Sequence, residues 1–295
     1  MTDRDPYASR IGGASAIVER EDPVVWEGGC GPLDAAQLAA YQASGFLVLR
    51  GLLSVAEAER LLVESERIAR GVDPARDDVI LEPASQAVRS VFRVHRDSQM
   101  FRGLTADHRL AGAARQILGD EVYIHQSRIN FKPAFEGEPF SWHSDFETWH
   151  VEDGMPRMRA LSASVLLTTN TEHNGPLLVI PGSHRRYVRC AGTTPPDHYK
   201  VSLRNQEYGS PDRAAITELA RDVQLASVTG PPGTVVLFDC NLMHASGGNV
   251  TPLARHNVFL VYNAVSNALR APYAQLSPRP HFLAEREVVP LARAR

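Results

Sequence analysis

Residues 140–150 read Phe-Ser-Trp-His-Ser-Asp-Phe-Glu-Thr-Trp-His, and this stretch gives the strongest indication of the kind of fold that the chain adopts. His143 and Asp145 stand two positions apart within it. On an extended segment such positions point to the same face, so an imidazole and a carboxylate can bind one metal ion. A second imidazole from elsewhere would complete a 2-His-1-carboxylate set with open positions on the metal. The stretch therefore predicts a third ligand in another part of the chain.

The composition is that of a globular chain without a nucleic-acid or membrane partner. Of the 295 residues, 43% are hydrophobic, which is enough for the core of one large domain. The formal net charge is −3, and charges of both signs are interspersed along the sequence. Neither a basic footprint for nucleic acid nor a polybasic segment for a membrane surface is present.

Three further features predict a cytoplasmic protein. No apolar run approaches the roughly 18 residues of a membrane-spanning helix. The first residues, Met1–Tyr7, lack the apolar centre of a signal peptide. Cys30, Cys190 and Cys240 are odd in number and far apart, which fits neither a disulfide framework nor a zinc site.

The N-terminal third is predicted to be mainly helical. Residues 1–32 mix glycine, proline and charged residues, which indicates an arm and not a core element. A short strand is expected over residues 46–50. Capping residues and terminal glycines predict three helices: from the cap Asp34 to Gly45, from the capping box Ser54-Val-Ala-Glu57 to Gly71, and from Asp107 to Leu118 before Gly119.

After Gly119 the pattern changes to short strands separated by turn residues. Strands are expected at 122–131, 161–167, 177–180, 234–238 and 257–263. Because strands and helices do not alternate, the pattern favours an antiparallel arrangement over a parallel doubly wound sheet. The predicted fold is mainly β with flanking helices: a double-stranded β-helix barrel of the jelly-roll or cupin type, braced by N-terminal helices.

We expect one domain over residues 1–295. Residues 1–120 form its helical support, and residues 121–285 form the barrel core. The longer and more polar segment 186–230 is interpreted as an insertion over the barrel and a candidate lid, with a helix near residues 214–221; the sequence does not decide whether the segment moves.

Three His-x-acid pairs compete as the metal site, so at least two are bystanders. His95-Arg-Asp97 is predicted to be a surface or helix-packing pair. His150-Val-Glu152 falls where a loop is expected, which indicates a solvated pair or one that supports a ligand. His143-Ser-Asp145 is favoured because of His244, which ends an apolar run directly before Gly247-Gly248-Asn249.

A turn centred between Asn249 and Val250 would place His244 opposite Arg255 on the next strand. Directly opposed residues lie about 5 Å apart on one face of a sheet. A guanidinium beside the metal suits 2-oxoglutarate, which chelates iron at one end and presents a distal carboxylate at the other. A zinc hydrolase with the same three ligands and a non-catalytic cupin-like binding protein remain alternatives, although a hydrolase gives no reason for Arg255.

The order His-x-Asp, a distant His and an Arg eleven residues later resembles the phytanoyl-CoA dioxygenase-like branch of the Fe(II)/2-oxoglutarate oxygenases. Pro181-Gly-Ser-His184 is also common there. The block from Phe140 to Pro156 is similar to the signature of the ectoine hydroxylase family. The remaining matching segments are His125-Gln-Ser-Arg-Ile-Asn130, His173-Asn-Gly-Pro-Leu177, Asp197-His-Tyr-Lys200 and Phe259-Leu-Val-Tyr-Asn-Ala-Val-Ser-Asn267.

The resemblance covers roughly residues 40 to 285 and implies a function. It implies a homodimer that hydroxylates ectoine to 5-hydroxyectoine with Fe(II), 2-oxoglutarate and O₂. Another small cyclic amino acid, such as proline, remains the alternative substrate. The implied site residues are His143, Asp145 and His244 for iron; Arg255, Asn130 and Ser246 for 2-oxoglutarate; and Gln126, Trp149 and Arg279 for ectoine.

The same residue types suit ectoine on chemical grounds. Ectoine is a small zwitterion with a cyclic amidinium and a carboxylate. Its binding calls for a cation for the carboxylate, an amide or an acid for the ring N–H groups and an aromatic face for the amidinium.

Overall fold

Two antiparallel sheets form the centre of the molecule in the computed structural model, which describes residues 5–203 and 208–293. The larger sheet has seven strands in the order β2-β11-β7-β13-β5-β4-β3, and the smaller has four in the order β10-β8-β12-β6. The strands of the larger sheet are β2 (Phe46–Leu49), β3 (Val79–Leu81), β4 (Val88–Phe92), β5 (Val122–Lys132), β7 (Ala160–Leu166), β11 (Val235–Asp239) and β13 (Arg255–Ala264). Those of the smaller are β6 (Phe140–His143), β8 (Leu177–Val179), β10 (Ala226–Val228) and β12 (His244–Ser246).

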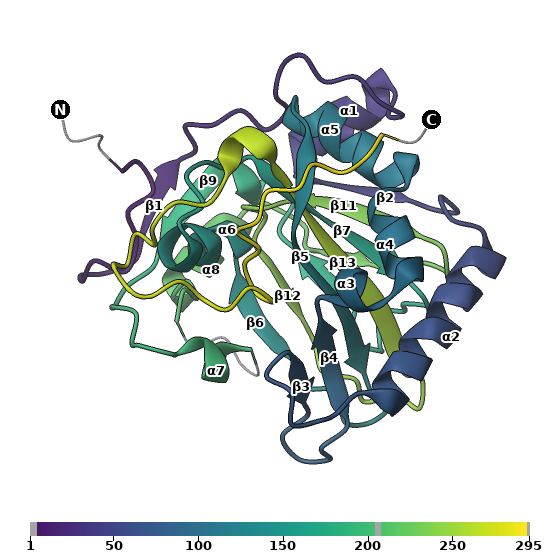
Figure 1. Cartoon of the computed structure of the whole chain (residues 1–295). Coiled ribbons are helices and arrows are strands. Elements are labelled where there is room, and N and C mark those ends of the chain that lie inside the picture. Colours follow the sequence, from purple (N-terminus) through teal and green to yellow (C-terminus); the bar gives the residue numbers. More distant parts are fainter. Residues whose placement is uncertain (1–4, 204–207, 294–295) are drawn as a thin grey trace.

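Alternation along the strands gives the larger sheet two buried faces. Leu260 of β13 and Val165 of β7 belong to the core that the sheet forms with the N-terminal helices. Leu166 and Phe259, which point the other way, pack with Val179 of the smaller sheet. The fold is therefore a sandwich of two sheets with helices on the outer face of the larger one, as the sequence predicts (Figure 1).

The predicted helices are present, and their caps form as expected. In α1 (Ala35–Ser44) and α2 (Val55–Gly71), the capping boxes begun by Asp34 and Ser54 are both formed. The third predicted helix is not uniform, because a π-helical turn η1 (His108–Gly112) precedes α5 (Ala113–Leu118). The predicted helix near 214–221 is α8 (Arg213–Ala220). The remaining helical segments are α3 (Val94–Asp97), α4 (Gln99–Thr105), α6 (Asp145–Thr148), η2 (Trp149–Asp153), η3 (Ser183–Arg185), α7 (Tyr199–Ser202) and η4 (Val265–Asn267).

Across the described ranges, none of these helices has the length and apolarity needed to cross a membrane. The division into a helical support, a barrel core and a lid stays a prediction. Residues 1–120 also contain strand β1 (Ala16–Glu19) and strands β2–β4, of which only β2 was predicted from the sequence. Within 186–230, strand β10 joins the smaller sheet at its edge beside β8.

The prediction of an arm outside the core was wrong for the described part of residues 1–32. Strand β1 (Ala16–Glu19) pairs antiparallel with β9 (Arg186–Arg189). Tyr7 is 1% exposed and belongs to a cluster with Phe146 and Trp149. The partners of β1 lie about 170 residues away in sequence, so local composition gave no sign of them.

Residues 145–153 run through α6 and η2 and end at Gly154, which has a φ of 80°. His150 is 0% and Glu152 4% exposed and both lie in η2, so the expected loop and the solvated alternative for this pair were wrong, whereas a supporting role stays a prediction. His150 stacks on Tyr273 with ring centroids 3.9 Å apart. The segment is buried on both sides and is therefore a fixed support for the residues that it carries.

Gly154→Ala tests whether the segment 145–153 requires a glycine where it ends. A Cβ at Gly154 would overlap the carbonyl oxygens of Arg270 and Ala271. Gly28 is the matched control, because it has a φ of 86° with no atom within 4 Å of an added Cβ. We expect Gly28→Ala to lower the free energy of unfolding by about 1–2 kcal/mol from backbone strain alone. Gly154→Ala should lose about 1–3 kcal/mol more from the overlap. Equal losses in denaturant titrations would contradict this reading.

Candidate active site

His143, Asp145 and His244 come together at the end of strand β6. His143 is the last residue of β6 and lies opposite His244 of β12 in the strand register. Ser144 continues the extended backbone and Asp145 begins α6, so His143 and Asp145 face the same side as predicted. One ligand atom from each of the three residues lies within 4.8 Å of the others. The geometry is that of a three-ligand site with one open side.

Backbone carbonyls fix the orientation of both imidazoles, a feature that the sequence could not identify. The Nδ1 atom of His143 lies 2.8 Å from the Ser141 carbonyl oxygen, and that of His244 lies 2.9 Å from the Leu242 carbonyl oxygen. A ring that donates from Nδ1 keeps the lone pair of Nε2 for a metal. The Nε2 atoms lie 3.5 Å and 3.9 Å from Asp145 Oδ1.

The protonation states also suit a cation. Burial, together with the neighbouring His143, lowers the pKa of His244 to about 4. Burial opposes ionisation of Asp145, but His244 and His143 overcome it and lower the pKa of Asp145 to about 2. At neutral pH the His244 imidazole is therefore neutral and the Asp145 carboxylate is charged, which is the donor state that a divalent ion needs.

The predicted cross-strand pairing of His244 with Arg255 was wrong. His244 pairs with His143 and Val179 in the smaller sheet, whereas Arg255 pairs with Lys132 in the larger sheet. The connection between β12 and β13 crosses from one sheet to the other and is not a hairpin. The Asn249 side chain holds this crossing, donating to the carbonyl oxygens of Pro133 and Leu253 at 3.0 Å and 2.9 Å.

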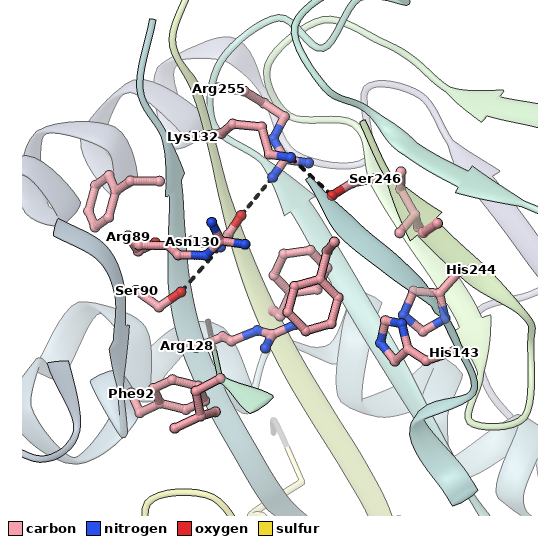
Figure 2. Close-up of a pocket in the computed structure, with 16 residues that line it drawn as sticks. Arg89, Ser90, Phe92, Arg128, Asn130, Lys132, His143, His244, Ser246 and Arg255 are labelled. Atoms are coloured by element: carbon pink, nitrogen blue, oxygen red, sulfur yellow. Dashed lines mark hydrogen bonds between the residues drawn. The ribbon is translucent and has the colours of Figure 1, made fainter. Parts of the chain in front are cut away.

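Arg255 and the two histidines nevertheless line one pocket from opposite sheets, as Figure 2 shows. Arg255 is 3% exposed, and its guanidinium donates to Asn130 Oδ1 at 2.6 Å. Ser246 lines the same pocket. No acidic residue within 5–203 and 208–293 forms an ion pair with Arg255, and burial lowers its pKa to about 9.

Three further basic residues line this pocket and were not predicted from the sequence: Arg89, Arg128 and Lys132. Arg128 is buried between Phe92 and Phe259, with its guanidinium carbon 5.8 Å and 5.0 Å from their ring centroids. Lys132 donates to Ser246 Oγ at 3.0 Å. The sequence did hold a signal: Gln126, Arg128, Asn130 and Lys132 occupy alternate positions of β5 and therefore share one face.

The positive charge of the arginines that line this pocket is only partly compensated by acidic residues of the described chain. Of the arginines that line the pocket, Arg89 is paired, with Glu82 at 3.0 Å. Arg128 and Arg255 each have a buried Nε atom without a hydrogen-bond partner. Burying such donors is costly unless something binds them, so the pocket suits a small anion with more than one carboxylate.

A second pocket lies beside the first and shares Arg128, Phe140, His143 and Leu203 with it. Gln126, Trp149 and Arg279 all line it, together with Asp145. The structure thus brings the three residues expected for the substrate to the open side of the ligand cluster. Trp149 is 4% exposed, and Gln126 donates its amide to the Leu283 carbonyl oxygen at 2.8 Å.

Arg279 lines this pocket, and its guanidinium already forms ion pairs with acidic residues of the protein. Its Nε and Nη2 atoms donate to the two carboxylate oxygens of Asp153 at 2.8 Å and 2.7 Å. Glu152 lies 3.7 Å from the same guanidinium. Any carboxylate that binds Arg279 therefore competes with acidic residues of the protein.

The other two His-x-acid pairs lie away from the cluster. His95 belongs to α3 and is half-buried, with Nδ1 2.5 Å from Ser127 Oγ. His150 uses its ring nitrogens on the Met155 carbonyl oxygen and on Asp5. Neither lines the two pockets of the ligand cluster.

Lys132 predicts a pH dependence of stability. Burial, with Arg255 and Arg89 nearby, lowers its pKa from 10.5 to about 6. Between these values the unfolded chain binds a proton that the folded chain does not, so stability rises with pH by up to about 1.4 kcal/mol per unit. Lys132→Met should remove this contribution. Unfolding free energies at pH 6.5 and 8.5 measure it, and an unchanged difference between the two pH values would refute it.

The chain matches the family model of phytanoyl-CoA dioxygenase (PhyH) over residues 41–257. It is 54% identical to the ectoine dioxygenase of Bordetella bronchiseptica over 289 residues, which cover 96% of this chain and 93% of the relative. It is likewise 54% identical to the ectoine dioxygenase of Sphingopyxis alaskensis, with 96% of this chain and 94% of the relative covered.

Solved structures agree with the sequence relatives. EctD from S. alaskensis in its apoform is 48% identical and superposes with a TM-score of 0.88, covering 99% of this chain and 98% of that one. EctD with 2-oxoglutarate and 5-hydroxyectoine gives a TM-score of 0.87 at 49% identity, with the same coverage. EctD with bound Fe also has a TM-score of 0.87. The predicted fold class is therefore confirmed, and the chain belongs to the phytanoyl-CoA dioxygenase family and, within it, to the ectoine dioxygenases.

Proposed function

We propose that this protein hydroxylates ectoine to 5-hydroxyectoine with Fe(II) and 2-oxoglutarate, consuming O₂ and releasing succinate and CO₂. One structural observation gives this proposal its strongest support. Both histidines of the three-ligand cluster line one pocket with a set of incompletely paired buried cations, and Asp145 lines the pocket directly beside it. The relatives named ectoine dioxygenase, and the EctD structure with 2-oxoglutarate and 5-hydroxyectoine, support the same chemistry.

His143, Asp145 and His244 are the proposed iron ligands. Fe(II), when bound, activates O₂ against 2-oxoglutarate and so supplies the oxidising power for the hydroxylation. The protein contributes a donor set with fixed tautomers and leaves the opposite side of the cluster open to both pockets. Ser162 supports the carboxylate ligand, with its hydroxyl 3.5 Å from Asp145 Oδ2.

Arg255 is the proposed partner of the distal carboxylate of 2-oxoglutarate, with Asn130 and Ser246 as helpers. Asn130 accepts from one nitrogen of the guanidinium and donates to Ser90 Oγ at 3.2 Å, so the Arg255 head group is oriented before a ligand arrives. Such preorientation lowers the entropy cost of binding. Lys132 donates to Ser246 Oγ and thereby leaves the Ser246 hydroxyl proton to another acceptor.

Gln126, Trp149 and Arg279 are the proposed ectoine contacts. Trp149 offers an aromatic surface for the amidinium, and Arg279 offers a cation for the carboxylate. These side chains lie on three different segments, namely β5, η2 and the C-terminal region, so they can orient a small ring from several sides. Positioning one C–H bond towards the ligand cluster is what the reaction requires of the pocket.

The alternatives have less support. A zinc hydrolase has no use for Arg255 and Arg128 beside its metal, and a non-catalytic binding protein has no use for an open coordination side.

We also propose that the protein is a homodimer, which size-exclusion chromatography with light scattering would test. Its three cysteines form no disulfide, in keeping with a cytoplasmic location.

Incubation with ectoine, Fe(II), 2-oxoglutarate and O₂ tests the function directly. We expect hydroxylated ectoine and succinate in equal amounts, and far less product from proline. His244→Ala should abolish both products and the visible charge-transfer band of the anaerobic Fe(II)/2-oxoglutarate complex. His95→Ala, from one of the other His-x-acid pairs, is the control and should keep band and products. Succinate without hydroxylated ectoine in the parent protein would overturn the choice of substrate.

Arg255→Ala separates the cosubstrate site from the substrate site. Removing a buried charge-assisted contact costs about 1.5–3 kcal/mol, so the KM for 2-oxoglutarate should rise at least about 10-fold. The KM for ectoine, measured at saturating 2-oxoglutarate, should stay within about two-fold, because Arg255 lines only the first of the two pockets. Equal effects on both constants would refute the assignment.

A further inference from the structure

Residues 5–10 lie against the side of segment 145–153 that faces away from the iron-ligand cluster. Three contacts show how closely. Asp5 Oδ1 lies 3.0 Å from His150 Nε2. The Tyr7 ring meets Phe146 edge to face with centroids 5.2 Å apart. Ser9 donates its hydroxyl to Glu147 at 2.6 Å. The N-terminal segment thus supports the outer face of the helical turn whose inner face carries Asp145 and Trp149.

Arg10 is the centre of this support. Its guanidinium pairs with Glu147 at 2.6 Å and with Glu152 at 2.5 Å, and the Arg10 side chain is 1% exposed. It also donates to the hydroxyl oxygens of Thr148 and Thr194 at 3.2 Å and 3.1 Å. One residue therefore joins the N-terminal segment, the site-bearing helical turn and the segment around residue 194.

The backbone of Arg10 is held in an unusual conformation. Its φ of 56° lies in the left-handed region, which costs about 1–2 kcal/mol for a residue with a Cβ. Gly209 packs directly on the ion pair, because a Cβ there would overlap Arg10 Nη2 and Glu147 Oε2. Close packing around a strained arginine indicates that this position needs the guanidinium itself.

Glu152 links Arg10 to the substrate pocket. The Oε1 atom that accepts from Arg10 also lies 3.2 Å from His198 Nε2, and Oε2 lies 3.7 Å from Arg279 Nε. His198 and Arg279 both line the second pocket. Around them, and among residues 5–203 and 208–293, the three acids Glu147, Glu152 and Asp153 form ion pairs with two arginines, Arg10 and Arg279. Without Arg10, Glu152 would have Arg279 as its remaining arginine partner.

We propose that Arg10 is a positioning residue for substrate binding: by neutralising Glu147 and Glu152 it leaves the Arg279 guanidinium able to bind the carboxylate of the substrate. The inference rests on the proposed function, because it assigns that carboxylate to Arg279. Arg10 itself lines neither pocket and acts through Glu152 and through the helical turn 145–153. The N-terminal segment thus supports the substrate site from outside the pocket.

Arg10→Gln tests the inference in steady-state kinetics. We expect the KM for ectoine to rise about 10-fold or more, because Glu152 then competes for Arg279, while the KM for 2-oxoglutarate changes by less than about two-fold. The dissociation constant of ectoine from iron-free protein, measured by calorimetry, should rise in parallel. The second change Glu152→Gln, made on Arg10→Gln, should restore most of the affinity, because the competing charge is gone.

Arg157→Gln is the matched control. Arg157 ion-pairs with Asp22, the residue that also accepts from Tyr7, so the variant loosens the same N-terminal region without touching Glu152. It should leave both KM values unchanged. If Arg10→Gln does not fold, Arg10→Lys replaces it, since an ammonium still pairs with Glu147 but cannot match the two-sided grip of a guanidinium. A smaller rise in the ectoine KM is then expected.

The outcomes separate this inference from the proposed function. Parent protein that forms no hydroxylated ectoine disproves the function itself. Active parent protein together with a folded Arg10 variant of unchanged ectoine KM disproves the role of Arg10. An equal rise in both KM values, or no recovery with Glu152→Gln, identifies Arg10 as a residue of general structural importance and also overturns the proposal.

Discussion

The strand register between β6 and β12 is the constraint on which the site depends. It sets His143 opposite His244. Successive side chains of a strand point to opposite faces, so a slip of one residue would turn one imidazole away from the other. Strand β12 is paired on both of its edges, because His244 also faces Val179 of β8. The extended residue Ser144 then carries the chain from β6 to Asp145. Backbone pairing thus places the two imidazoles, and the chain that continues from β6 into α6 places Asp145.

The interior between the two sheets contains charged side chains as well as apolar ones. On one side of the ligand cluster, Phe238, Val236 and Leu166 form an ordinary apolar core between the sheets. On the other side, β5 and β13 present the cations Arg128 and Arg255 to the same interior, beside Lys132, whose lowered pKa leaves its amine mostly neutral at neutral pH. Buried cations without acidic partners destabilise a fold unless a ligand binds them. The arrangement therefore exchanges some stability of the empty protein for affinity towards a small dianion.

The pocket proposed for the substrate differs from the first pocket in the balance of its charges. Its acids and arginines are nearly balanced among themselves, with Arg279 held by Asp153 and Glu152 held by Arg10. A zwitterion such as ectoine brings little net charge, so a balanced wall suits it better than a cationic one. The two pockets meet at Arg128, Phe140 and His143, where cosubstrate and substrate would both approach the iron ligands.

The sequence by itself determined the helices whose caps are local, such as those begun by Asp34 and Ser54, and the alternation that makes β5 and β13 two-faced. It also marked His143, Asp145 and His244, because a short spacing and a following turn are visible in one dimension. Only the tertiary structure decided that Arg255 reaches the pocket from the other sheet, that Ser141 and Leu242 orient the histidines, and that the N-terminal segment packs behind residues 145–153. These features depend on pairings between distant segments, whose energy comes from burial and register and not from local sequence.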